Sequence, residues 1–338
     1  MKTTILAAFL TLTTVVGFSG WWFWRDMQAQ LHAPLSLAAA VDFTITPGMS
    51  LKSVCRELQK TELLPKAHYL WIAARLQGRE RQIKAGEYLI AAGTTPAQLL
   101  DQFIAGKVKH YALTLIEGWT LNRVLDEIKH NGQLVHSLDT SDHFRILAMV
   151  GLEDKASAEG LFFPDTYHFT RGTTDVEFLR RASRRMQKIL AEEWQQREAG
   201  LPYNTPYEAL IMASLIEKET AVPEERPLIA GVFVRRLQKG MPLQTDPTVI
   251  YALGEDFDGN LRKEDMAIAS PYNTYVHAGL PPTPIAIPGR EAVHAALHPE
   301  EGTALYFVAM GNGAHHFSET YSEHMKAVAR YQKGSGGE

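Results

Sequence analysis

Two closely spaced glutamates, Glu217 and Glu219, have the setting that best suits acid–base chemistry. The second continues an apolar stripe formed by Met212, Leu215 and Ile216 on a predicted helix. Glu217 lies about 200° around that helix, so both carboxyls cannot face one pocket. An apolar surrounding and a nearby helix C-terminus both disfavour an ionised carboxyl. The pattern therefore predicts a raised pKa for Glu219, which suits a proton donor to a leaving oxygen; the competing interpretation is a solvated residue in a fraying last turn.

Polar groups cluster again at the start of a later helix, where Gln244, Thr245 and Asp246 follow one another. Amide and hydroxyl groups of this kind hydrogen-bond sugar hydroxyls and N-acetyl groups, so all three are candidate substrate-binding residues. For Asp246 the simpler interpretation is a helix N-cap.

The loop over residues 270–289, rich in proline and glycine, carries further candidates, Tyr272, Asn273 and Tyr275. Aromatic rings and amides on a rigid loop suit the binding of pyranose rings, although a solvated irregular loop explains the composition equally well. Glu217 is kept as a further substrate-binding candidate. His315 and His316 alternate on a predicted strand, so only one can face a pocket; His316 is the candidate retained, against the simpler interpretation of a surface histidine.

Local signals define the elements that must position these residues. Thr205-Pro206-Tyr-Glu208 is a capping box that opens a very apolar helix running to about Thr220. The other elements expected in this half of the chain are a helix from Thr174, a helix over 224–239, a short helix over 246–254, a hairpin with strands 305–310 and 315–317, and a helix over 318–332.

A pattern of strand, Gly turn, Ser or Thr cap and amphipathic helix repeats near the N-terminus. The segment from Phe43 to Val54 aligns with the segment from Leu113 to Val124, and 113 minus 43 gives an offset of 70 residues. A looser third copy begins at Gly86. Such small units cannot bury their faces alone, so neighbouring copies are expected to pack together.

The first residues predict a membrane anchor. No charged residue occurs from Thr3 to Trp24, and three tryptophans lie toward the end of this run. Lys2 before it and Arg25 after it weakly favour a cytoplasmic N-terminus. A cleaved signal peptide is the alternative, but the run is long and Trp-rich for one. Residues 26–40 are interpreted as a linker.

Composition excludes some classes of protein. The chain has 338 residues, 45% of them hydrophobic, with a net charge of −4, which leaves room for two domains and gives no basic field for nucleic acid. Its one cysteine permits no internal disulfide. The sequence contains no zinc-protease motif, cysteine pair, nucleophile elbow or phosphate loop, so no metal and no cofactor are predicted.

Five motifs together resemble one family, the endolytic murein transglycosylase G (YceG-like) family, and the similarity runs from the anchor nearly to the C-terminus. In chain order these motifs are Phe163-Pro-Asp-Thr-Tyr167, Glu217-Lys-Glu219-Thr-Ala, Leu243-Gln-Thr-Asp-Pro-Thr-Val-Ile-Tyr251, Tyr272-Asn-Thr-Tyr and Gly279-Leu-Pro-Pro.

The resemblance implies an α+β protein with an N-terminal transmembrane helix, a small LysM-like β/α module and a mixed α/β catalytic domain built around a buried catalytic helix. The corresponding boundaries are 1–25 for the anchor, 26–40 for the linker, 41–108 for the module, 109–333 for the catalytic domain and 334–338 for a disordered tail.

The resemblance also implies endolytic cleavage of nascent peptidoglycan strands between N-acetylmuramic acid and N-acetylglucosamine, leaving 1,6-anhydro ends. The family's catalytic glutamate falls on Glu219. The expected location is the bacterial inner membrane, with a single pass through residues 3–24, the N-terminus in the cytoplasm and the catalytic domain in the periplasm. Peptidoglycan synthases are expected partners.

Two other functions fit parts of the sequence. A glycoside hydrolase would need a second carboxylate, for which Asp165 or Asp246 are candidates. A non-catalytic, membrane-tethered peptidoglycan-binding protein would need only the repeats.

Overall fold

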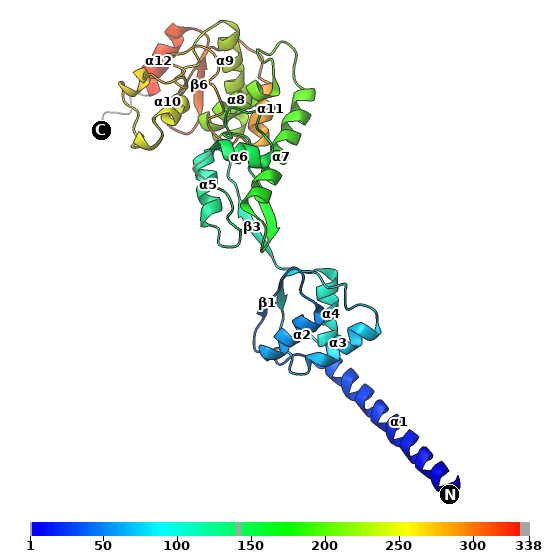
Figure 1. Ribbon diagram of the computed structural model, residues 1–338. Coiled ribbons are helices and arrows are strands. Elements are labelled where there is room, and N and C mark those ends of the chain that lie inside the picture. Colours follow the sequence, from blue (N-terminus) through cyan, green and yellow to red (C-terminus); the bar gives the residue numbers. More distant parts are fainter. Residues whose placement is uncertain (1, 140–142, 332–338) are drawn as a thin grey trace. The chain divides into compact units, whose positions relative to one another are not determined.

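The computed structural model describes residues 2–139 and 143–331, and it has an α+β fold of helices with small two-stranded antiparallel sheets (Figure 1). Contacts within the chain divide it into two compact units. The first contains residues 1–111 and 169–172, and the second contains residues 112–168 and 173–338. The predicted boundaries assigned 109–111 and 169–172 to the catalytic domain instead. The predicted tail, 334–338, lies outside the described residues.

The first unit is a small sheet covered by helices. Its elements are α1 (Lys2–His32), β1 (Val41–Ile45), α2 (Leu51–Lys60), α3 (Ala67–Leu76), β2 (Gly86–Ile90) and α4 (Pro96–Ala105). β1 and β2 are antiparallel, with Val41 opposite Ile90. Phe103 of α4 stacks on Phe43 of β1 and meets Tyr88 of β2 edge-on, with ring centroids 6.1 and 4.8 Å apart. These aromatic contacts hold α4 against the sheet.

The linker predicted after the anchor is wrong in its first half, because α1 continues to His32. Met27, Leu31 and Leu35 are 1%, 6% and 7% exposed and belong to the core of the first unit. The spacing of four residues puts Met27 and Leu31 on one side of α1, and Leu35 follows just after the helix ends. Asp26 fixes the same segment by accepting a hydrogen bond from the hydroxyl of Tyr69 at 2.6 Å.

Earlier along α1 the large apolar side chains are exposed. They include Phe9, Leu12, Val16, Trp21 and Trp22. Within the part of the chain that the structure describes, no helix is both long enough and apolar enough to cross a membrane.

The repeated pattern is confirmed as local structure. Ser50, Thr95 and Thr120 each accept a hydrogen bond from the backbone N–H three residues later, and each opens a helix of ten residues. The prediction that neighbouring copies pack together is confirmed for the two copies adjacent along the chain, whose strands β1 and β2 pair. The remaining copy differs, because its strand β3 (His110–Thr114) pairs with β4 (Thr166–Thr170). The intervening pair of helices, α2 and α3, lets β1 and β2 meet as antiparallel neighbours.

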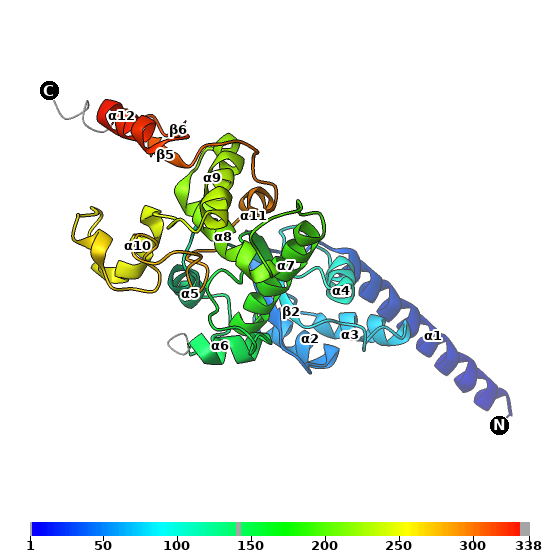
Figure 2. The same cartoon turned by 90° about the horizontal axis from the view of Figure 1, so that it is seen from above.

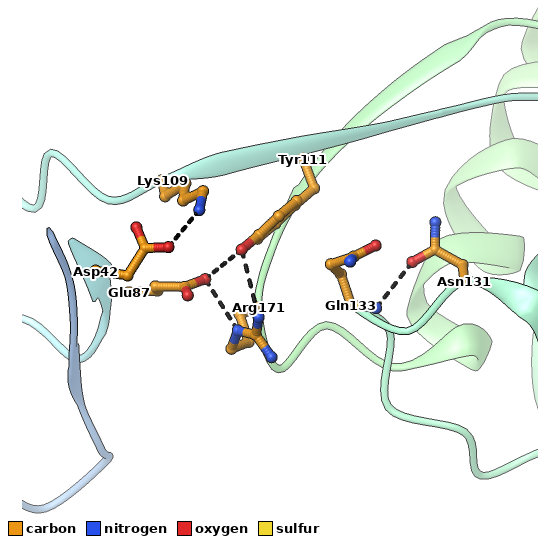
Figure 3. Close-up of polar contacts among 7 residues, drawn as sticks. All are labelled: Asp42, Glu87, Lys109, Tyr111, Asn131, Gln133 and Arg171. Carbon is orange, nitrogen blue, oxygen red and sulfur yellow. Dashed lines mark hydrogen bonds and ion pairs between the residues drawn. The ribbon is translucent and has the colours of Figure 1, made fainter. Parts of the chain in front are cut away.

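A buried carboxylate on β2 contacts a residue of β3 and the residue that follows β4 (Figure 3). Glu87 of β2 is 5% exposed and accepts hydrogen bonds from the Tyr111 hydroxyl at 2.5 Å and from Nε of Arg171 at 2.9 Å. Lys109 pairs with Asp42 beside it at 2.7 Å. Burial alone would raise the pKa of Glu87, but the contacts with Tyr111 and Arg171 outweigh it and hold the pKa below its usual value.

The second unit is mainly helical, with helices packed around one central helix. Its helices and C-terminal strands are α5 (Leu121–His130), α6 (His143–Val150), α7 (Asp175–Gln195), α8 (Pro206–Glu219), α9 (Arg226–Gln238), α10 (Asp246–Leu253), α11 (Arg290–Leu297), β5 (Tyr306–Ala309), β6 (His315–Ser318) and α12 (Tyr321–Tyr331).

The predicted apolar helix is α8, and it lies at the centre of this unit. Every residue from Ala209 to Ile216 is buried, and α7, α9, α10 and α11 all contact the helix (Figure 2). Thr205 caps it, as predicted, by accepting the N–H of Glu208 at 3.2 Å. The carboxyl of Glu208 accepts the N–H of Asn204 instead of completing the capping box. The predicted hairpin is β5–β6, in which Val308 faces His316.

Candidate active site

Glu219 is the last residue of α8, and its carboxyl is held by a threonine from another element. The Thr245 hydroxyl donates to Oε2 of Glu219 at 2.6 Å. Thr245 is 1% exposed, and its own N–H donates to the Thr274 hydroxyl at 3.1 Å. The contact therefore joins the end of α8 to the start of α10 and to the loop after it.

The surroundings of Glu219 favour its neutral form. Burial raises the pKa of this carboxyl to about 7, and the negative charge of Asp246 acts in the same direction. The Thr245 hydrogen bond and the charge of His315 oppose the rise. A carboxylic acid with a pKa near 7 can donate a proton at neutral pH and take one back afterwards.

Three threonines form the support behind this contact. Thr245, Thr248 and Thr274 are all at most 2% exposed. The hydroxyls of Thr248 and Thr274 are 2.8 Å apart, and Thr248 also donates to the Thr245 backbone oxygen at 2.7 Å. Because each hydroxyl has a partner, the Thr245 side chain is fixed in the orientation that serves Glu219. The sequence analysis identified only Thr245 in this group.

Asp246 is not the N-cap of α10. Thr245 occupies the cap position without a side-chain capping bond, since its hydroxyl is used by Glu219, and Asp246 is the first helical residue. The Asp246 carboxyl accepts the Tyr275 hydroxyl at 2.5 Å. Two predicted site residues are thus paired beside Glu219. Burial and the hydrogen bond to Asp246 raise the pKa of the Tyr275 hydroxyl, and the charge of Glu219 acts in the same direction.

Gln244 precedes this pair in a strained conformation. Its φ is 53°, which is unusual for a residue with a side chain, and its side chain is exposed. Arg236, 6% exposed, holds the segment by donating from Nη1 to the backbone oxygens of Pro242 and Leu243 and to Oε1 of Gln244. Strain of this kind persists where surrounding contacts over-determine the backbone, and it concentrates at functional sites.

Two of the predicted substrate-binding residues are occupied by contacts within the protein. Asn273 is 0% exposed, donates to the backbone oxygens of Met266 and Ile268, and accepts the N–H of Tyr275. Its side chain therefore holds the loop backbone together through buried hydrogen bonds. The Glu217 carboxyl accepts the N–H of Gly289 at 2.9 Å, so it anchors the start of α11.

Tyr272 is half-buried, and its hydroxyl lies 2.8 Å from that of Thr283. Its ring lies 4.9 Å from that of Tyr251. This aromatic side chain of the loop therefore packs against α10.

The histidine that faces inward on β6 is His315, whereas the predicted candidate His316 is exposed. Glu225 accepts both the backbone N–H of His315 at 2.6 Å and a hydrogen bond with its Nδ1 at 2.7 Å. The Thr220 hydroxyl, next to Glu219 in sequence, donates to the same carboxyl at 3.2 Å. Burial alone would raise the pKa of Glu225, but His315 outweighs it and holds the pKa below its usual value. Strand alternation showed that one histidine faces inward but could not show which.

Another acid with a raised pKa, Glu159, lines a cavity of about 490 Å³ close to these residues. Burial raises the pKa of Glu159 to about 7, although its carboxyl accepts the Leu121 N–H at 2.8 Å and the Tyr251 hydroxyl at 3.1 Å. The cavity wall also includes Lys218 and Pro247, the sequence neighbours of Glu219 and Asp246. Its volume is in the range of ligand sites. Nothing in the sequence around Glu159 distinguished it from a surface carboxylate.

A larger cavity of about 760 Å³ lies elsewhere in the second unit. It is lined mainly by apolar side chains of the α6–α7 region and the start of α8, including Leu152, Met186 and Leu210. The acid–base groups described above lie outside it.

The model of the YceG-like family matches residues 43–330, which is most of the chain. The chain belongs to the YceG-like family. Glu219 and the three threonines all lie within the part of the chain that carries the family match.

Individual relatives agree with this assignment. The endolytic murein transglycosylase of Bacillus subtilis (strain 168) is 33% identical over 307 residues, covering 86% of this chain and 84% of that protein. The protein of the same name from Streptococcus pneumoniae (strain D39) is 27% identical over 357 residues, covering 96% of this chain and 64% of that protein. The crystal structure of a putative yceG-like protein from Listeria monocytogenes matches with a TM-score of 0.55 at 28% identity, covering 86% of this chain and 99% of that one.

Proposed function

We propose that this YceG-like protein is an endolytic peptidoglycan lytic transglycosylase with Glu219 as its general acid and base. The observation that carries the proposal is the combination of a raised pKa, about 7, and a fixed hydrogen bond from Thr245 on the same carboxyl. Its relatives named endolytic murein transglycosylase support the same activity.

The contact with Thr245 assigns the two oxygens of Glu219 different tasks. Oε2 accepts the Thr245 hydroxyl, so the proton of the neutral acid belongs on Oε1. Oε1 gives this proton to the glycosidic oxygen while the bond from that oxygen to C1 of N-acetylmuramic acid breaks. The sugar's own C6 hydroxyl then forms a bond to C1, and its proton passes to Glu219, which restores the acid. Because the nucleophile belongs to the substrate, one carboxyl suffices.

The other polar groups are arranged to serve this step. As Glu219 loses its proton, the Thr245 hydrogen bond and the charge of His315 stabilise the carboxylate that forms. The exposed side chains of Gln244 and Asp246 are available to sugar hydroxyls and N-acetyl groups. The cavity beside Glu159 and Lys218 offers room for a neighbouring part of the strand.

A glycoside hydrolase is the second candidate, and one observation favours it. Asp246 affects the pKa of Glu219 and keeps a fixed orientation through Tyr275, as a second carboxylate would need. The other predicted partner, Asp165, forms an ion pair with Arg185 at 2.7 Å.

Product analysis tests the proposal. The full-length chain in detergent is incubated with isolated glycan strands, and the new ends are identified by mass spectrometry. We expect 1,6-anhydro ends, and a loss of about 10²- to 10⁴-fold in rate for Glu219→Gln. Glu217→Gln is the matched control, since it removes a carboxyl on the other side of α8 and should retain most of the activity.

Three other outcomes would contradict the proposal. Reducing ends would establish the hydrolase. Binding of strands without cleavage would establish a non-catalytic peptidoglycan-binding protein. Full activity of Glu219→Gln would show that another residue is the acid.

We further propose that the chain is a single-pass inner-membrane protein, anchored through residues 3–24, with its N-terminus in the cytoplasm and its catalytic unit in the periplasm near peptidoglycan synthases. The uncharged sequence of this segment and the exposed apolar side chains along α1 support the anchor. The strand–helix–helix–strand order of β1, α2, α3 and β2 supports a LysM-like module.

A further inference from the structure

We propose that Glu193, His294 and His298 form a binding site for a zinc-like divalent cation that connects α7 to α11. The carboxylate comes from α7, while the two imidazoles lie four residues apart, His294 within α11 and His298 directly after its last residue. One potential ligand atom from each residue lies within 4.8 Å of the other two. Two imidazoles and one carboxylate are an established ligand set for Zn²⁺, with a fourth position left to water.

The distance between the first two ligand atoms is close to that of a bound metal. Nδ1 of His294 lies 2.9 Å from Oε2 of Glu193. Two ligands of a tetrahedral zinc, each about 2.0–2.2 Å from the ion, are separated by roughly 3.3 Å. A shift of a few tenths of an ångström therefore lets a cation replace the proton that now joins these two atoms.

The third ligand, His298, has a ring nitrogen without a hydrogen-bond partner among the described residues. The nitrogen is Nε2 of His298, which is shielded from solvent. Its other nitrogen, Nδ1, lies 3.8 Å from the carboxyl of Glu198. The two rings stack with centroids 4.2 Å apart, which holds the two imidazoles side by side next to Glu193. A buried imidazole nitrogen without a partner is costly, and a metal ion would satisfy it.

The surrounding charge favours a cation. Glu192, Glu193 and Glu198 contribute three carboxylates near the site. Arg290 and Lys188 contribute two cations, so one net negative charge remains when the imidazoles are neutral. Arg290 donates from Nε to Oε1 of Glu193 at 2.8 Å. This leaves Oε2 as the coordinating oxygen and fixes its direction, as hydrogen bonds to metal-bound carboxylates commonly do.

Metal binding tests the proposal independently of catalysis. The full-length chain in detergent is stripped with a chelator, dialysed against Zn²⁺ at low micromolar free concentration and analysed for bound metal. We expect about one zinc per chain, a rise in the unfolding temperature with zinc, and a visible d–d spectrum when Co²⁺ replaces it.

Matched variants locate the site. His294→Gln/His298→Gln and, separately, Glu193→Gln should each lose at least tenfold in zinc affinity, while circular dichroism verifies that they remain folded. His130→Gln and His316→Gln remove exposed histidines and should bind like the wild type. Equal binding by wild type and double variant would mean adventitious binding by other histidines, and it would overturn the proposal, as would a wild type that binds no zinc.

Discussion

Thr245 donates its hydroxyl to Oε2 of Glu219 over 2.6 Å, and both residues lie at helix ends, one closing α8 and the other preceding α10. The helix whose interior is completely buried thus carries the proposed catalytic acid at its last residue. There burial raises the pKa of the carboxyl, while the residue as a whole is only half-buried.

The first prediction concerns the pH dependence of cleavage. Since the pKa of Glu219 is about 7 and the acid form is needed, the cleavage rate should fall tenfold for each pH unit well above pH 7. Initial rates on soluble glycan strands between pH 5 and pH 9 measure this limb. A rate that stays constant up to pH 9 would contradict the role of Glu219 as a neutral acid.

The second prediction concerns two neighbours that shift the pKa of Glu219 in opposite directions. Thr245→Val removes a hydrogen bond that lowers this pKa, and Asp246→Asn removes a charge that raises it. The alkaline limb of the pH profile should move upward in the first variant and downward in the second. Thr245→Val should also lose about ten- to a hundredfold in rate, because the bond stabilises the forming carboxylate. Thr245→Ser keeps the hydroxyl and should stay close to the wild type.

The third prediction separates the two histidines of β6. His315→Gln removes a charge that lowers the pKa of Glu219, so the alkaline limb should move upward and the rate should fall about tenfold. His316→Gln, on the other face of the strand, should change neither. Equal effects of the two variants would indicate a structural role for the hairpin, with no electrostatic role for His315.

The fourth prediction concerns the stability of the second unit. The pKa of Glu159 in the folded protein, about 7, lies above its usual value of 4.5, so its contribution to stability is complete below about pH 4.5 and is lost as the pH rises through 7. Wild type should therefore lose on the order of 3 kcal/mol of unfolding free energy between pH 5 and pH 9 that Glu159→Gln does not lose.

Urea unfolding of the full chain at pH 5, 7 and 9 measures this difference. The glutamine can still accept the Leu121 N–H and donate to the Tyr251 oxygen, so the variant should fold. Glu291→Gln, at an exposed position on α11, is the control and should follow the wild type at every pH.

Elements that depend on neighbouring residues could be predicted from the sequence. The caps at Thr174 and Thr205, the apolar stripe of α8 and the hairpin around Gly311–Gly313 all follow from residues within one or two turns of each other. The divergence of Glu217 and Glu219 follows from helical geometry alone, and the structure confirms it: one carboxyl meets Gly289 and the other meets Thr245.

Features that depend on distant residues could not be predicted. The side of the sheet that His315 faces is decided by Glu225, 90 residues away, and Asn273 is buried because the loop folds over it. The cluster at Glu193 depends on a contact spanning 101 residues, and no local motif signals it. The buried end of α1 is mostly polar in sequence, and only Met27 and Leu31 enter the core, so it could not be told from a linker without the module that packs against it.

That continuity of α1 has a mechanical consequence. No flexible joint separates the exposed apolar part of α1 from the part that contains the buried Met27 and Leu31, because one unbroken helix forms both. Rotation of α1 about its own axis therefore turns the rest of the first unit with it. For the same reason a soluble fragment must keep the chain from Arg25 onward, since a cut at Val41 would remove part of the core that α3 and α4 are packed against.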